Sequence, residues 1–338
     1  MRQLHEEEPS DQRVTHQLER LLSLTRRWEE LVELYEAEAQ RRGRGGYDSL
    51  VLLGRLARDQ MDDPELAASA LQRAVTLNPG GSDALEHLKE LYTRCERWAE
   101  LLDTLRLEIG LVKDPRQREQ RLRQAGQLAE DKLGDLSTAE RFYAEAQPLA
   151  PRDRNLLVAL GRVQEGRGEW AGLVETLRKE LGLTRDRQEG IRLRRKMAVA
   201  LADKLGRPYE AIALYRKILE LDPRDQDAIV QLCDLLREQQ EWGDLTQALE
   251  LRLRGEPHSL PLRLELAEVN AERLEQPQPA VQAAEQVLAQ DPKNRAAAEL
   301  LVKVRRRFGG APAGLAADLQ RLAGVSQGRE RAEVLFDL

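Results

Sequence analysis

The sequence predicts an all-α protein whose helices stack along the chain as a solenoid, and three observations support this fold class. First, of the 338 residues, 33% are charged, 41% are hydrophobic and only 4% are aromatic. Leu, Ala, Glu and Arg dominate, and their side chains lose little freedom in a helix, whereas the β-branched residues that favour strands are sparse. The other two observations are sets of residues that recur with one period. The composition disfavours a large β-sheet.

Four tryptophans and four prolines recur at nearly the same interval. The tryptophans lie in RRWEEL, ERWAEL, GEWAGL and QEWGDL, as Trp28, Trp98, Trp170 and Trp242, at intervals of 70, 72 and 72 residues. The prolines are Pro79, Pro151, Pro223 and Pro292, at intervals of 72, 72 and 69 residues. Because two residue types keep one period, the chain is predicted to consist of modules of about 72 residues.

Within each module the apolar spacing is helical, as in Ile229, Leu232 and Leu236 at steps of three and four. Each periodic proline is expected to follow the end of a helix. The residue two places later is expected to cap the next helix, and these residues are Gly81, Asp153, Asp225 and Asn294. An alanine twelve places before each proline is expected where two helices approach closely. These alanines are Ala67, Ala139, Ala211 and Ala280.

Half a module, 34 to 38 residues, resembles the tetratricopeptide repeat family. In the segment ending at Pro223, the family's small, aromatic and proline positions are matched by Ala198, Ala211, Tyr215 and Pro223. The segment ending at Pro151 matches with Gly126, Ala139, Tyr143, Ala146 and Pro151, and the segment ending at Pro79 with Leu53, Gly54, Ala67 and Ala74. Every second repeat departs from the family because its tryptophan opens the second helix. The alternate repeats carry one extra turn residue, in DQMDD, DKLGD, DKLGR and ERLEQ.

The resemblance implies a right-handed superhelical solenoid of about eight helix-turn-helix repeats, paired into two-repeat modules. These repeats are expected over residues 11–292. Residues 1–10 are expected to form a flexible N-terminus, and residues 293–338 to form C-terminal capping helices and a tail.

The sequence contains no catalytic constellation, so we expect no enzyme activity, no cofactor and no metal site. No two of the histidines lie three or four residues apart, the spacing that metal ligation on one helix face requires; they are His5, His16, His87 and His258. Gly43, Gly45 and Gly46 lack the Lys and Ser/Thr that complete a phosphate loop, which favours a plain loop. Cys95 and Cys233 lie too far apart for a paired-thiolate site, and Cys233 is expected to be packed.

The net charge and the hydropathy of the sequence indicate which classes of partner and which cellular location to expect. The net charge is −6 with both signs mixed along the chain, which disfavours nucleic acid as a partner. No window approaches the roughly 20 apolar residues of a membrane span, and the N-terminus lacks the apolar run of a signal peptide. A cytoplasmic protein is expected, with its oligomeric state open.

The tryptophans and the basic runs each have two interpretations. A tryptophan ladder could stack bases or sugars, but one tryptophan at the same helix start in each module favours a repeated core anchor. The basic runs at residues 305–307 and 194–196 could contact phosphate, but solvated helix surfaces are favoured.

One set of residues is a candidate binding site. In solenoids of this family the first helix of each repeat lines the concave groove. Some members hold a partner's C-terminal carboxylates with Lys and Asn on one repeat, Asn on the next and two basic residues on the third. The resemblance assigns these roles to Arg123 and Gln127, then Ala159 where Asn would stand, then Arg192 and Lys196.

Asn155 and Arg162 lie on the same expected helix as Ala159 and are candidates to replace the missing amide. Guanidinium groups bind carboxylates in bidentate fashion, so an acidic peptide would suit this site. The alternative is that these are ordinary surface arginines.

Together these features predict a non-enzymatic protein–protein interaction scaffold that binds a peptide or helix of a partner protein in the concave groove. The alternative is a structural or assembly subunit that oligomerises through its apolar C-terminal tail, which contains Val334, Leu335, Phe336 and Leu338. Nucleic-acid binding by an Arg-rich groove is less favoured, because of the net charge.

Overall fold

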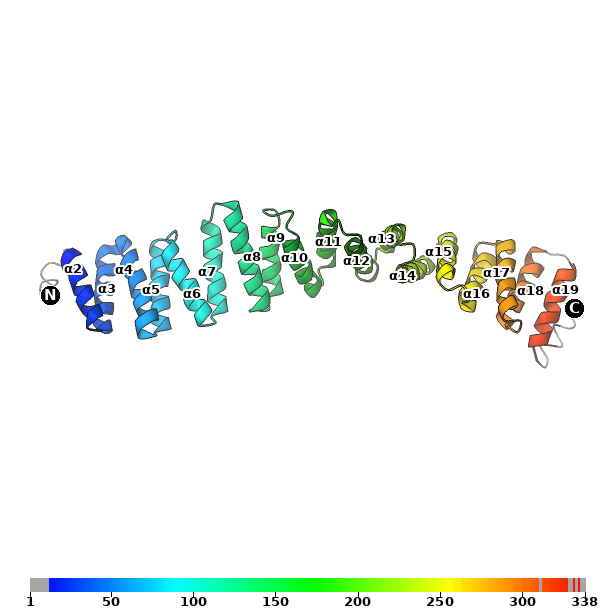
Figure 1. Ribbon diagram of the computed structural model, residues 1–338, viewed down its shortest axis with the longest axis horizontal. Coiled ribbons are helices and arrows are strands. Elements are labelled where there is room, and N and C mark those ends of the chain that lie inside the picture. The colour runs from blue at the N-terminus through cyan, green and yellow to red at the C-terminus, as the bar shows by residue number, and fades with distance from the viewer. Residues whose placement is uncertain (1–11, 310–311, 328–330, 332–333, 335–338) are drawn as a thin grey trace. The chain divides into compact units, whose positions relative to one another are not determined.

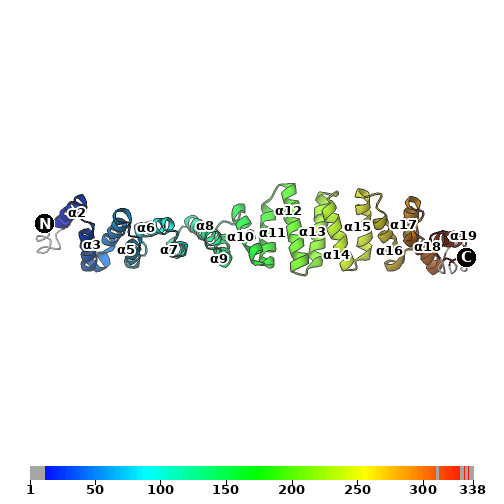
Figure 2. The ribbon, with the colours of Figure 1, turned by 90° about the horizontal axis from the view of Figure 1, so that it is seen from below.

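The computed structural model describes residues 12–309, 312–327, 331 and 334. All regular elements in this part of the chain are helices, so the predicted all-α class is confirmed. The chain divides into two compact units, Met1–Thr176 and Leu177–Leu338. Figures 1 and 2 show from two sides that the helices within each unit lie next to one another in chain order.

In the first unit each helix packs against the next one in the chain, which gives a succession of hairpins. The helices are α2 (Gln12–Leu24), α3 (Trp28–Arg42), α4 (Tyr47–Leu56), α5 (Pro64–Leu77), α6 (Ser82–Arg94), α7 (Trp98–Leu111), α8 (Pro115–Asp131), α9 (Leu136–Ala146) and α10 (Arg154–Arg167). The next helix, α11 (Trp170–Leu183), contains the boundary between the units.

The second unit repeats the same pattern of consecutive packed helices. They are α12 (Arg187–Val199), α13 (Pro208–Leu221), α14 (Gln226–Glu238), α15 (Trp242–Gly255), α16 (Leu260–Glu268), α17 (Pro277–Gln290), α18 (Arg295–Phe308) and α19 (Pro312–Val325). In the C-terminal tail, Val334 is half-buried against the core cluster of this unit. Leu335, Phe336 and Leu338 lie outside the described residues, as do residues 1–10.

The helices begin and end close to the residues at which the sequence predicts their ends. The four tryptophans are the first residues of α3, α7, α11 and α15. The Asp153 side chain caps α10 by accepting from the backbone N–H of Asn155 at 2.8 Å, and Asp225 caps α14 by accepting from Ala228 at 2.9 Å. Asn294 caps α18 in the same way. Such caps satisfy N–H groups that have no partner inside the helix.

In three of the four alternate repeats the extra residue is accommodated by a π-helical turn, whereas no such turn follows α8 at DKLGD. These turns extend α4, α12 and α16 and span Ala57–Met61, Ala200–Lys204 and Val269–Arg273. Each widens the helix by one residue: Leu205 N–H donates to the Ala200 carbonyl at 3.1 Å, a bond between residues five apart. A π turn absorbs an insertion without breaking the helix, so the departure from the family pattern leaves the hairpins in register.

The turn inside each hairpin contains one residue with positive φ. These residues recur every 34 to 38 positions, with φ between 52° and 73°: Arg26, Asp62, Glu96, Gly134, Gly168, Gly206, Gln240 and Glu275. Glycine adopts this left-handed conformation without strain, whereas other residues clash with their own backbone. Five of the turns therefore carry a strain that the other three avoid.

Replacing Glu96 or Gln240 with glycine is therefore expected to raise the free energy of unfolding, by about 0.5–1 kcal/mol each. Urea unfolding followed by circular dichroism measures the change. Ala99→Gly, at an exposed position inside α7, is the control and should lower stability by about 1 kcal/mol. Equal losses in all three variants would contradict the left-handed turn.

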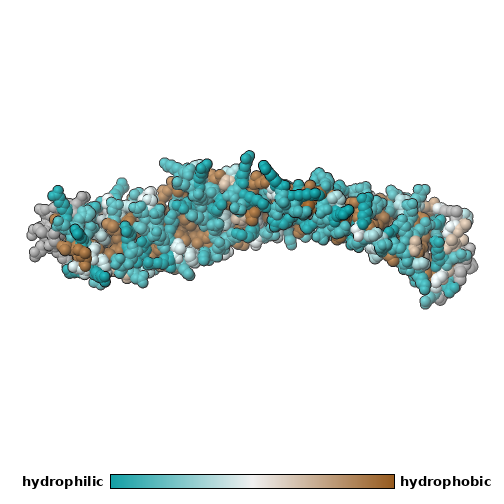
Figure 3. Space-filling view, in the orientation of Figure 1, coloured by the Kyte–Doolittle hydropathy of each residue, from teal (hydrophilic) through white to brown (hydrophobic). Residues whose placement is uncertain are grey.

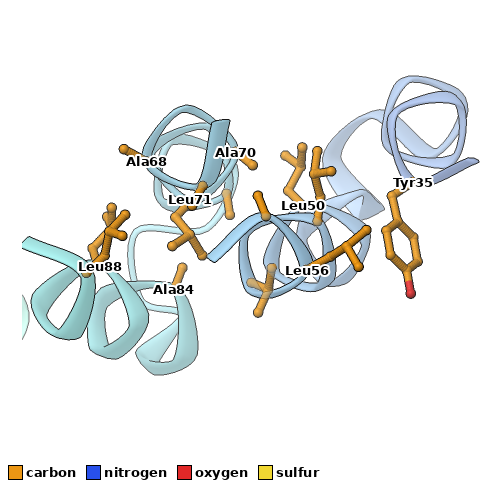
Figure 4. Close-up of a cluster of buried hydrophobic side chains, with 14 of the residues drawn as sticks. Tyr35, Leu50, Leu56, Ala68, Ala70, Leu71, Ala84 and Leu88 are labelled. Carbon is orange, nitrogen blue, oxygen red and sulfur yellow. The ribbon is translucent and has the colours of Figure 1, made fainter. Parts of the chain in front are cut away.

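The core runs between the layers of helices. Figure 4 shows Leu71 of α5 lying between α4, which carries Leu50, and α6, which carries Leu88. The four periodic alanines are 0% exposed, which confirms their place at close helix approaches. Gly54 plays the same role, because a Cβ there would lie 2.5 Å from the Leu71 Cγ atom.

The tryptophans occupy the margin of the core and not its centre. All four are half-buried, and the largest fully buried side chains are Tyr92, Tyr143 and Tyr215. The ring of Trp98 has the Lys132 ammonium 5.0 Å from its centroid, and the ring of Trp242 has the Arg273 guanidinium at 4.9 Å. Trp98 and Trp242 thus each meet a cation from the following hairpin over the ring.

Burial makes the two cysteines chemically different. Cys233 is 0% exposed, and burial raises the pKa of its thiol to about 11, whereas Cys95 is half-buried. Because the thiolate is the reactive species, iodoacetamide at pH 8 should alkylate Cys95 in the native protein and leave Cys233 unmodified, as peptide mass spectrometry would show. Rapid labelling of Cys233 at pH 8 would contradict its burial.

The folded state holds the Cys233 proton more tightly than the unfolded state does. The free energy of unfolding should therefore fall as the pH rises from the ordinary thiol pKa of about 8.5 to the raised value of about 11.

Candidate functional site

The first helices of two successive hairpins, α8 and α10, carry four of the six predicted binding residues. Arg123 and Gln127 lie on α8, and Asn155 and Arg162 lie on α10. Two ion pairs join these helices: Arg123 with Asp153, and Arg162 with Glu130. The structure therefore brings these four residues onto one surface of the first unit. We call the surface between the two ion pairs the α8–α10 window.

Arg162 is held by a chain of contacts that starts in the core. The Tyr143 hydroxyl, on a fully buried ring, donates to Glu130 at 3.0 Å. Glu130 in turn accepts from Arg162 Nε at 2.6 Å and from its Nη2 at 2.9 Å. Burial and the neighbouring Glu130 carboxylate raise the pKa of Tyr143 above its ordinary range. The Arg162 side chain nevertheless remains 62% exposed, and its Nη1 has no part in this bidentate pair.

The Arg123 side chain pairs with two carboxylates and is less exposed than that of Arg162. Its guanidinium donates to Glu119 at 2.9 Å and to the capping carboxylate of Asp153, and its side chain is 31% exposed. Desolvation raises the pKa of Asp153, but hydrogen bonds from Arg123 and from the backbone N–H of Leu156 outweigh it, so the net shift is downward. Asp153 thus stays ionised while it caps α10 and ties it to α8.

The α8–α10 window contains two amides and one apolar side chain. Gln127 and Asn155 are exposed, and Val158 on α10 is 44% exposed. Ala159, at the position of the family's Asn, is half-buried. Val158 was not among the predicted site residues, although its place one turn beyond Asn155 on the same helix is a signal in the sequence.

The other two predicted residues lie in the second unit, on α12. Arg192 donates to Glu189 at 3.0 and 2.5 Å, and its side chain is 70% exposed. Lys196 is half-buried.

Arginine–carboxylate pairs between consecutive hairpins are a general feature of both units. They join residues 28 to 32 positions apart: Arg58 with Glu90, Arg123 with Asp153, Arg162 with Glu130, Arg195 with Asp225, and Arg237 with Glu265. The basic run at the end of α18 is paired as well, Arg305 with Asp318 at 2.5 Å and Arg307 with Glu275. These pairs were not predicted from the sequence, although the separation of nearly one repeat between the arginine and the carboxylate is a signal for them.

The described part of the chain offers neither a metal-binding cluster nor a membrane-spanning helix. Within the described residues, no cluster of three or more His, Cys, Asp or Glu side chains could hold a metal ion. None of the described helices is both long enough and apolar enough to span a bilayer. The face drawn in Figure 3 is mostly hydrophilic, with its apolar residues in small separate patches.

The repeated hairpins match known family models. One model of the tetratricopeptide repeat matches residues 84–119 and 156–190, and a second model of the same repeat matches residues 197–225. The chain contains tetratricopeptide repeats. The first two matches cover α6 with α7 and α10 with α11, two hairpins whose first helix lacks a π turn. These repeats support a role as a protein–protein interaction scaffold.

Several solved structures are similar to this tetratricopeptide repeat chain. YrrB, described as a TPR protein with an unusual peptide-binding site, is 16% identical with a TM-score of 0.34, over 53% of this chain and 89% of that one. A structure of Naa15/Naa10 bound to HypK-THB is 17% identical with a TM-score of 0.42, over 99% of this chain and 54% of that one. MamA is 16% identical with a TM-score of 0.35, over 55% and 96%. These similarities concern the helical fold alone. No curated protein matches the chain significantly.

Proposed function

We propose that this chain is a non-enzymatic scaffold that binds an extended peptide segment of a partner protein at the α8–α10 window. The observation that carries the proposal is the pair of exposed amides, Gln127 and Asn155, beside the exposed Val158 and between two fixed ion pairs. In this family the first helices line the concave groove, so the window would lie inside it.

The chemistry of the window suits a peptide backbone. An amide side chain both donates and accepts, as a peptide group does. Two such side chains on neighbouring helices can hold an extended main chain without regard to its side chains, while Val158 contacts an apolar residue. The ion pairs help because they fix the helices before binding, which reduces the entropy lost in the complex.

An acidic residue in the partner would add to this affinity. The Arg162 guanidinium uses Nε and Nη2 for Glu130 and keeps an exposed edge for a second carboxylate. On α12, the exposed Arg192 and the half-buried Lys196 are the proposed basic residues of the second unit. We assign Arg123 chiefly to positioning, because two carboxylates already engage it.

Selection of a random peptide library against the purified chain tests the proposal. Affinities of the selected peptides would be measured by fluorescence polarisation for the wild type and for Gln127→Ala/Asn155→Ala. Two lost hydrogen bonds of about 1 kcal/mol each correspond to a roughly thirty-fold weaker affinity.

Gln117→Ala is the matched control, because it removes an exposed amide from the first turn of the same helix, α8. It should leave the affinity unchanged. If every selected peptide binds the double variant as tightly as the wild type, the window is not the binding site.

A further inference from the structure

A second recess lies between α7 and α9, the second helices of two successive hairpins. Ile109 and Phe142 form its floor, Arg106, Arg141 and Glu145 form its rim, and Gly110 lies at its edge. The two floor residues belong to the core, 6% and 8% exposed. We call this recess the α7–α9 pocket. Its lining residues are all different from those of the α8–α10 window.

In the preceding module an ion pair crosses the corresponding groove. There, between α3 and α5, Arg73 donates to Glu36 at 2.6 and 2.9 Å. Counted from the start of each helix, Arg106 holds the place of Glu36, and Glu145 holds the place of Arg73.

The equivalent pair is not made at the α7–α9 pocket. Arg106 donates to Asp103 on its own helix at 2.9 Å, and its guanidinium lies 5.8 Å from the centre of the Phe142 ring. Glu145 makes no ion pair within the described part of the chain. The α7–α9 pocket therefore lacks the ion pair between helices that spans the corresponding groove of the preceding module, where a recess lies beside Arg73.

The sequence differences between the two modules also favour an apolar ligand here. Ile109 and Phe142 hold the places of Ala39 and Ala70, so the floor is enlarged with apolar atoms. Gly110 holds the place of Gln40, so a side chain is removed from the edge. A Cβ added at Gly110 would meet nothing within 4 Å. Its backbone φ is not positive, so conformation gives no reason for glycine inside α7.

The charged residues near the pocket indicate which groups of a ligand would lie next to its apolar side chain. Within the described residues, neither Arg141 on the rim nor Lys113, three residues beyond Gly110, has an ion-pair partner. Arg106 is already neutralised by Asp103. On the rim Arg141 balances Glu145, and the exposed Lys113, which follows Gly110 closely in the chain, adds one positive charge that complements a carboxylate.

We propose that the α7–α9 pocket is a second docking site, which takes one apolar side chain of an acidic segment of a partner protein. The apolar side chain contacts Ile109 and Phe142 above Gly110. Carboxylates next to it in the partner pair with Arg141 and Lys113. The site uses the outer helices, so it operates independently of the α8–α10 window.

A fluorescein-labelled peptide with one Phe between two pairs of Glu is the probe, with fluorescence polarisation as the readout. The wild type should bind it at least ten-fold more tightly than a peptide with Ala for Phe or with Lys for each Glu. Gly110→Leu should fill the recess and weaken binding at least ten-fold. Leu favours a helix over Gly, so this variant should fold, which circular dichroism checks.

Gly182→Leu is the matched control, because Gly182 holds the same place in α11 and its added Cβ also meets nothing within 4 Å. It should bind the probe as the wild type does, and so should Gln127→Ala/Asn155→Ala, which separates this site from the window. The proposal is overturned if Gly110→Leu binds like the wild type, if both glycine variants lose binding equally, or if the wild type shows no preference for the acidic Phe peptide up to about 1 mM.

Discussion

Replacing Tyr143 with alanine is expected to lower the free energy of unfolding by about 3–5 kcal/mol, the range for truncating a buried aromatic side chain. Tyr143 is 0% exposed, and its ring lies against Gly126, where an added Cβ would be 2.5 Å from Cε1. The variant leaves a cavity at this contact. It also removes a hydrogen bond from Glu130, the carboxylate that holds Arg162.

Urea unfolding followed by circular dichroism measures the loss in the free energy of unfolding. Two other tyrosine variants serve as comparisons. Tyr143→Phe keeps the ring and removes only the hydrogen bond to Glu130, so it should cost about 1 kcal/mol. Tyr209→Ala removes a side chain that is 59% exposed and should change stability by no more than about 0.5 kcal/mol. A cost below 1 kcal/mol for Tyr143→Ala would mean that this part of the core is not packed as described.

The hairpins could be predicted from the sequence because their signals are local. A tryptophan marks the start of a helix, and a periodic proline follows the end of one within a few residues. A capping Asp such as Asp153 bonds only to N–H groups of the helix that it precedes. The positive φ of Glu96 or Gln240 could not be predicted, since neither residue type favours that conformation. At these turns the packing of the two helices determines the backbone conformation, against the conformational preference of the residue itself.

The candidate site was predicted less completely, because it depends on contacts between repeats. Arg123 and Arg162 were predicted as site residues from their place in a helix. Whether such an arginine is available to a partner depends on a carboxylate one repeat away, Asp153 or Glu130 here. The half-burial of the tryptophans has the same origin, since the Lys132 that lies over the Trp98 ring belongs to the following hairpin.

Replacing Ala211 with leucine is expected to destabilise the second unit by about 3 kcal/mol. Ala211 lies on α13, is 0% exposed and is one of the periodic alanines at which helices approach closely. Extra carbon atoms in a packed core force side chains out of their rotamers or helices apart, at a cost of about 1–3 kcal/mol. The upper end applies here because neighbouring helices on both sides, α12 and α14, pack against α13.

Ala213→Leu provides the matched control on the same helix, because Ala213 is exposed. It introduces the same side chain with the same helix propensity, so its stability should stay within about 0.5 kcal/mol of the wild type. Hydrogen exchange read by mass spectrometry localises the effect: amides of α12, α13 and α14 should exchange faster in Ala211→Leu and unchanged in Ala213→Leu. Equal stability of the two variants would show that the period of the alanines does not reflect helix packing. A large loss in Ala211→Leu alone would show that the period is maintained by the space between helices, because the two positions differ only in what surrounds them.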